Sequence, residues 1–104
     1  MTLPRVVVTG LGALTPIGNT IQEYWNGLIE GKSGAGPITH FNAEKFKTRF
    51  ACEVKDFTVQ DYIDRKEARR MDPYAQYAMV TATQAIEDAG LVDSGINGDR
   101  IGVI

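Results

Sequence analysis

The side chains best suited to chemistry are few. His40 is the single histidine and Cys52 the single cysteine among 104 residues, and a dyad of the two is conceivable although they lie twelve positions apart. An unpaired cysteine on an apolar strand face, however, usually behaves as a small hydrophobe. We therefore expect Cys52 to point into the core and His40, beside Phe41 in a loop, to be a surface or hydrogen-bonding residue. No spacing of carboxylates completes a zinc site around this pair.

Two glycine-rich stretches resemble phosphate-binding loops and fail on spacing. Gly10–Thr15 follows an apolar run, but Thr15 replaces the third small residue of the dinucleotide-binding turn and Pro16 interrupts the helix that should open there. Gly31–Ser33 lacks the upstream glycine of a P-loop, because position 26 is Asn26. Motifs alone therefore predict no nucleotide site and no catalytic centre in this stretch.

A basic segment is the one remaining candidate. Residues 64–72 hold four cations within six consecutive positions. Lys66, Arg69 and Arg70 have the spacing i, i+3 and i+4, so on a helix they share one face. One interpretation, which the residues alone favour, is a solvated face neutralised by the three carboxylates of the same segment. The other is a small cationic dock for an acidic protein partner.

The elements that must position these residues follow from the hydrophobic pattern. We expect strands at 5–12 and 100–104, each buried on both faces, and a half-buried strand at 50–54 with Phe50, Cys52 and Val54 inward. Helices are expected from a cap at Asn19 or Thr20 to residue 30, as a short turn at 64–71, and from 72 to 89. The carboxylate of residue 72 should cap the last helix, whose apolar residues suggest burial on more than one side. Alternating strands and helices indicate an α/β class with a mainly parallel sheet.

Composition narrows the class of protein. Apolar residues make up 43% and charged residues 23% of the chain, as in soluble globular proteins. A net charge of −2 argues against a nucleic-acid partner, and no apolar run is long enough for a membrane span. The start lacks the features of a signal peptide, and a single cysteine favours a reducing cytoplasm. Because the chain stops inside an apolar strand, we expect it to be a piece of a longer protein.

A family resemblance rests on a co-linear set of motifs that covers essentially all 104 residues. Its members are Arg5–Gly12 followed by Thr15–Gly18, Phe50–Phe57, Arg65–Glu67 with Arg69 and Met71–Asp72, and Asp88–Leu91. In order and spacing the set resembles the type II 3-oxoacyl-[acyl-carrier-protein] synthases. The resemblance implies a thiolase-like fold of α-β-α-β-α layers, of which residues 1–104 would be the first β-α-β-α-β part of the N-terminal half.

The same resemblance implies an activity and its partners. The family elongates fatty acids by a decarboxylating Claisen condensation of acyl and malonyl groups carried on acyl carrier protein. It uses a cysteine nucleophile and two histidines, works as a homodimer, and needs no metal or redox cofactor, since the carrier holds the phosphopantetheine.

The resemblance carries over to some residues only. The family's cysteine and histidines lie downstream of the matched region, so it implies that neither Cys52 nor His40 is catalytic and that this chain alone is inactive. The basic segment does match, which makes Lys66, Arg69 and Arg70 candidates for carrier docking. Three alternatives stay open: a polyketide ketosynthase, a non-catalytic relative of the chain-length-factor kind, and a 104-residue binding module.

Overall fold

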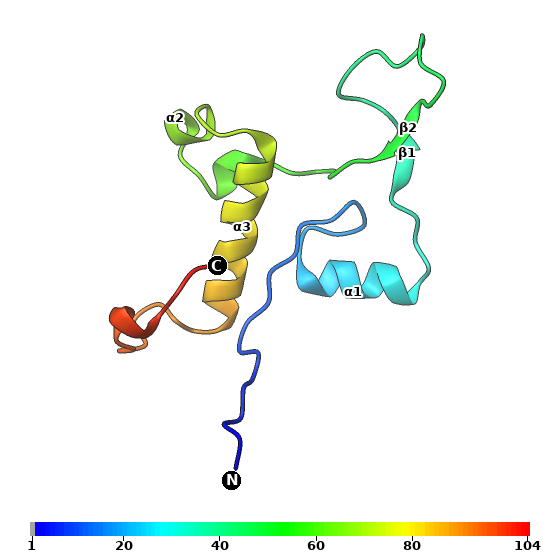
Figure 1. The fold of residues 1–104 in the computed structure, drawn as a ribbon. Helices are drawn as coiled ribbons and strands as arrows, with labels where there is room; N and C mark the ends of the chain where they lie inside the picture. Colours follow the sequence, from blue (N-terminus) through cyan, green and yellow to red (C-terminus); the bar gives the residue numbers. More distant parts are fainter. Residues whose placement is uncertain (1) are drawn as a thin grey trace.

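A computed structural model describes residues 2–104 as an open arrangement of helices with one small hairpin at its edge (Figure 1). In chain order the elements are α1 Ile21–Ile29, β1 Ala35–Pro37, β2 Phe50–Cys52, the 3₁₀ turn η1 Val59–Asp61, α2 Arg65–Ala68, α3 Pro73–Asp88 and the 3₁₀ turn η2 Gly98–Arg100. The two long helices were predicted within one or two residues, because their start and stop signals are local.

Both long helices begin and end as the sequence predicts. The Thr20 hydroxyl accepts from the Glu23 N–H at the start of α1, and Pro73 opens α3. Gly31 and Gly90 follow the helices with φ of +67° and +64°, the left-handed conformation that ends a helix. One detail of the prediction is wrong: the Asp72 carboxylate accepts no capping hydrogen bond. Proline at the first position already removes one of the donors that such a cap would satisfy.

The segment before α1 crosses α3 at very short range. A Cβ on Gly10 would lie 2.6 Å from the Ala89 nitrogen, and one on Gly12 would lie 2.9 Å from the Thr81 carbonyl carbon. Both distances are shorter than any real Cβ contact, so only glycine fits there. The residues of α3 and its C-cap at this crossing, Thr81, Ala85 and Ala89, are small, which lets the backbone of the segment approach the helix closely.

Two polar side chains of α3 hold the crossing segment in place. The Ala13 N–H donates to Gln84 Oε1 and the Leu11 N–H donates to Asp88 Oδ2, each at 2.9 Å. Gln84 Nε2 also donates to the Asn19 carbonyl at 2.8 Å. These bonds give partners to backbone groups that no neighbouring strand pairs.

β1 and β2 form an antiparallel hairpin in which Gly36 lies opposite Ala51. β1 lies where the sequence predicts no strand, and β2 is shorter than the strand predicted at 50–54. The predicted inward face is wrong for Phe50, which is 64% exposed, and for Cys52, which is exposed, whereas Ala51 and Glu53 are half-buried. Val54, the third residue of that face, is half-buried but lies beyond β2. With only one partner strand and no layer beneath it, the hairpin has no core for the Phe50 face to enter.

The strands predicted at 5–12 and 100–104 do not form. The sheet described within residues 2–104 has two strands, and neither terminal segment pairs with another. Their valines and isoleucines are largely exposed, with Val6 at 91%. A strand is defined by its ladder of hydrogen bonds, so an apolar run without a neighbouring strand stays irregular.

The chain is much less compact than a domain of its length. Its radius of gyration is 17.6 Å, against about 13 Å for a folded domain of 100 residues. It exposes 8849 Å², whereas a folded monomer of 11.4 kDa exposes about 5,800 Å². The expectation that α3 is buried on several sides is also wrong here. Of its residues only Val80 is buried, while Tyr74 is 76% exposed.

Candidate functional site

The basic segment forms one short exposed turn. Residues 65–70, called the basic turn below, comprise α2 (Arg65–Ala68), its C-terminal cap Arg69 and the following residue Arg70. The Asp64 carboxylate starts the turn by accepting from the Lys66 N–H at 3.0 Å. Bonds from the Arg69 N–H to the Arg65 carbonyl and from the Arg70 N–H to the Glu67 carbonyl continue it. The turn is thus shorter than the 64–71 helix predicted from the sequence. It nevertheless keeps the three candidate cations in one hydrogen-bonded helical turn.

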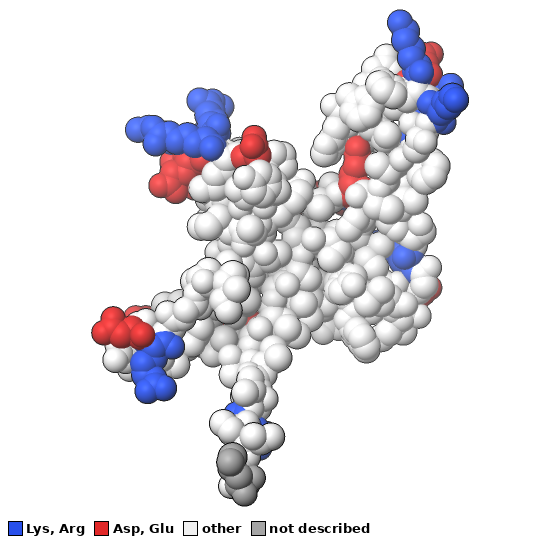
Figure 2. Space-filling view, viewed as in Figure 1, with Lys and Arg blue, Asp and Glu red and all other residues white. Residues whose placement is uncertain are grey.

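The cations of the basic turn are exposed and make no ion pair with the turn's own carboxylates. Lys66, Arg69 and Arg70 are all exposed, and Figure 2 shows Lys and Arg side chains projecting beyond α2. Within residues 2–104 the ion pair found at 4.0 Å or less is His40 with Glu53, elsewhere in the molecule. The turn therefore presents its positive charge to solvent.

One side of the basic turn is fixed to α3. Ala68 is 4% exposed, and Gln76 Nε2 donates to the Ala68 carbonyl at 2.9 Å and to the Met71 carbonyl at 3.3 Å. Sequence reasoning missed Gln76. Gln76 could have been noticed because it is a polar residue on the side of α3 that faces other parts of the chain. A polar side chain in such a place needs a hydrogen-bond partner.

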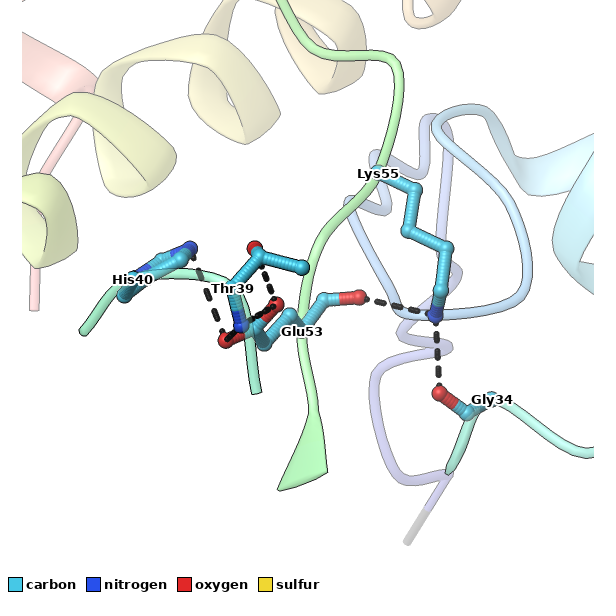
Figure 3. Close-up of polar contacts among 5 residues, drawn as sticks. All are labelled: Gly34, Thr39, His40, Glu53 and Lys55. Atoms are coloured by element: carbon cyan, nitrogen blue, oxygen red, sulfur yellow. Dashed lines mark hydrogen bonds and ion pairs between the residues drawn. The ribbon is translucent and has the colours of Figure 1, made fainter. Parts of the chain in front are cut away.

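The remaining chemical candidates do not come together. His40 is 62% exposed, and its Nε2 lies 3.9 Å from Glu53 Oε1 (Figure 3). No described contact joins it to Cys52, which is exposed and not in the core as predicted. The prediction of a surface histidine is confirmed, and the His40–Cys52 dyad finds no support. Among residues 2–104 no group of His, Cys, Asp and Glu side chains assembles in the number that a metal ion requires.

Glu53 is the carboxylate with the best-defined surroundings. The Thr39 hydroxyl donates to Oε2 at 2.8 Å and the Thr39 N–H donates to Oε1 at 3.1 Å (Figure 3). These hydrogen bonds, the one from the hydroxyl foremost, lower the pKa of Glu53 below its ordinary value, and His40 adds a small attraction. The arrangement closes the base of the loop between β1 and β2.

Lys55, close to Glu53 in the chain, also connects separate segments by hydrogen bonds. Its Nζ donates to the carbonyls of Gly34 at 2.8 Å and Glu53 at 3.1 Å (Figure 3). It also donates to the carbonyl of Pro16 at 3.3 Å. It thereby joins the segment before α1 to both sides of the hairpin. Lys55 also borders a polar pocket of about 280 Å³ between these segments. With three carbonyl partners, its ammonium group is committed to structure.

No helix among the described residues is both long enough and apolar enough to cross a membrane.

Comparison with known proteins identifies the family. Residues 4–104 match the family described as beta-ketoacyl synthase, N-terminal domain, and the chain belongs to this family. It is 57% identical over 100 residues to "3-oxoacyl-[acyl-carrier-protein] synthase 2" of Synechocystis sp., covering 96% of this chain and 24% of that protein. The protein of the same name from Vibrio harveyi is 48% identical over 103 residues, covering 99% of this chain and 25% of its own length. The chain thus spans about a quarter of the curated relatives that it matches.

A solved structure gives the same fold. "The ishigamide ketosynthase/chain length factor" superposes with a TM-score of 0.76 at 40% identity, covering 92% of this chain and 23% of that one. The predicted α/β, thiolase-like ketosynthase class is therefore confirmed for the part of the fold that this chain contains.

Proposed function

We propose that this chain is the N-terminal part of a 3-oxoacyl-[acyl-carrier-protein] synthase of the type II kind. The intact protein would be an acyltransferase that elongates fatty acyl chains by condensing acyl and malonyl groups with loss of carbon dioxide. The observation that carries the proposal is the 57% and 48% identity, across nearly the whole chain, to two proteins of that name. Residues 1–104 would then supply part of the N-terminal domain and none of the catalytic side chains.

The role proposed for this chain is docking of the acyl carrier protein on the basic turn. Lys66, Arg69 and Arg70 are exposed and free of ion pairs with the described carboxylates, so they can meet an acidic partner without first losing an internal one. Exposed charges of this kind act mainly on the rate of association and on specificity. No resident metal or redox cofactor enters the proposal, because the phosphopantetheine arrives on the carrier.

Assembly and location are proposed on the same basis. We propose a homodimer when the protein is intact, as the family resemblance implies, and a reducing cytoplasmic location. The single cysteine of the chain supports the second point, since it has no partner within these 104 residues.

Charge reversal tests the docking role in the full-length protein that carries this chain. Lys66→Glu, Arg69→Glu and Arg70→Glu together should raise KM for the carrier-bound substrate and leave kcat for a carrier-free pantetheine thioester unchanged. The effect should shrink as salt rises, because screening sets in within about 10 Å at 0.1 M. The matched control reverses Lys32, Lys45 and Lys47, three exposed cations outside the basic turn, with the same change in net charge.

Two outcomes would contradict the docking role. A triple variant with native KM at low salt would make the basic turn a solvated surface only. An equal loss in the control variant would assign the effect to overall charge.

A second candidate is a ketosynthase of polyketide type or a non-catalytic chain-length-factor-like subunit. The ishigamide structure favours it, at 40% identity over 92% of this chain. Sequencing the remainder of the gene tests the chain-length-factor alternative, since a condensing enzyme of either type requires the downstream cysteine and two histidines and a chain-length factor lacks the cysteine.

A further inference from the structure

We propose that Gln76 is the positioning residue of the basic turn: its side-chain amide fixes the turn on α3, and carrier affinity depends on that attachment. This inference rests on the docking role proposed above. Gln76 carries no charge and lies on α3, outside the turn that it would orient.

The geometry of the amide suits this role. Nε2 lies 2.9 Å from the Ala68 carbonyl oxygen and 3.3 Å from that of Met71. A glutamine amide has two N–H donors, enough for one bond to each carbonyl. These carbonyls lie at the C-terminal end of the turn, where helical carbonyls have few backbone partners. The Ala68 carbonyl also accepts from the Met71 N–H at 3.2 Å. Gln76 is also half-buried, which limits competition from water.

Few hydrogen bonds attach the basic turn to the rest of the described chain. Among residues 2–104, the two bonds from Gln76 are the only hydrogen bonds between residues 64–71 and the rest of the molecule. Burial of Ala68 supplies a small apolar contact in addition. A helical turn of four residues is too short to be stable by itself. The orientation of the cations therefore depends on this amide together with the apolar packing of Ala68 and the contact of α2 with η1.

Loss of the attachment should weaken carrier binding without removing any charge. An ordered cationic surface binds more tightly than a mobile one, because the mobile one must be ordered on binding. Gln76→Met keeps the length of the side chain and removes both donors. We expect Kd for acyl carrier protein to rise about two- to tenfold, the range that corresponds to one net hydrogen bond.

Gln84→Met is the matched control. Gln84 is also half-buried on α3, and its amide also bonds to backbone groups, but to those of Ala13 and Asn19. The same substitution there should lower stability without changing carrier affinity. A general loosening of α3 would affect both variants alike.

The experiment uses the full-length protein and acyl carrier protein as the probe. For Gln76→Met we expect weaker carrier binding, faster hydrogen exchange at the amides of residues 69–71, a higher KM for carrier-bound substrate and unchanged kcat with a carrier-free thioester. Native affinity in Gln76→Met, or an equal loss in Gln84→Met, would overturn the inference.

The charge-reversed variant separates this inference from the docking proposal. If that variant loses affinity and Gln76→Met does not, the positioning role alone fails. If the charge-reversed variant binds the carrier as the native protein does, the docking proposal itself fails.

Discussion

Adding one methyl group at Gly12 should break the crossing of the N-terminal segment over α3. The Cβ of Gly12→Ala would overlap the Thr81 carbonyl oxygen and lie 2.9 Å from its carbonyl carbon. An ordinary carbon–oxygen contact is about 3.3 Å or longer. The obstacle is helix backbone, which cannot rotate aside as a side chain would, so the segment must lift away from α3.

The expected loss of stability has two parts. Overpacking at a close contact costs about 1–3 kcal/mol. Lifting the segment also stretches the bond from the Ala13 N–H to Gln84, a neutral hydrogen bond with a net value of about 0.5–1.5 kcal/mol. The free energy of unfolding should therefore fall by about 2–4 kcal/mol, a large share of the 5–15 kcal/mol typical of a domain.

Urea unfolding of the full-length protein measures the change. Gly98→Ala is the control, because a Cβ there meets no atom within 4 Å, the residue has no positive φ, and it lies in the η2 turn and not in a predicted strand. Its effect should stay within about 0.5 kcal/mol, as for other surface substitutions. Hydrogen exchange at the Leu11 and Ala13 amides should accelerate in Gly12→Ala alone. Equal unfolding midpoints for the two variants would refute the close-contact argument.

Three further predictions concern the isolated chain, Glu53 and Cys52. Because the chain exposes far more surface than a compact monomer of its mass, it should melt broadly or self-associate; sharp two-state melting of a monomer, with mass measured by ultracentrifugation, would contradict this. The lowered pKa of Glu53 means that its stabilising effect on the hairpin is present above the ordinary carboxyl pKa and lost as pH falls through the lower folded value. An NMR titration of the Thr39 amide should follow that loss, Glu53→Gln should abolish it, and Glu44→Gln, in the same loop, should leave it unchanged. Finally, the isolated chain should show no condensation activity, and Cys52→Ala should leave kcat of the full-length protein unchanged, since the exposed thiol lies at no described site; a dead Cys52→Ala enzyme would reverse that assignment.

The helices could be predicted because their signals are local. A capping hydroxyl at Thr20, proline at the first position of α3 and a glycine after each helix all act within a few residues. The terminal strands could not be predicted in the same way. Val6–Val8 have the composition of a buried strand, but a strand needs a neighbour whose position no local pattern specifies. Their exposure here reflects the absence of that neighbour among the described residues.

The hairpin shows a second limit of pattern reading. The alternating pattern correctly places Phe50 and Cys52 on one face of the strand and Ala51 and Glu53 on the other. Their hydrophobicity then predicts that Phe50 and Cys52 point inward, whereas the structure exposes them. The hydrogen bonds of Thr39 to Glu53 hold the opposite face against the rest of the hairpin. A charged residue can thus occupy the less exposed side of a strand when its oxygens find donors.

The basic turn shows why counting charges underestimates the positive charge that a surface can present. Residues 64–72 contain four cations and three carboxylates, so the sequence suggests near neutrality. In the structure the Asp64 carboxylate is directed to the backbone N–H of Lys66, where it stabilises the start of the turn. None of the three carboxylates forms an ion pair with a described cation. The acid that starts the turn is therefore hydrogen-bonded to backbone and makes no ion pair with the described cations, so the capping residue leaves the charge of the proposed docking residues unneutralised.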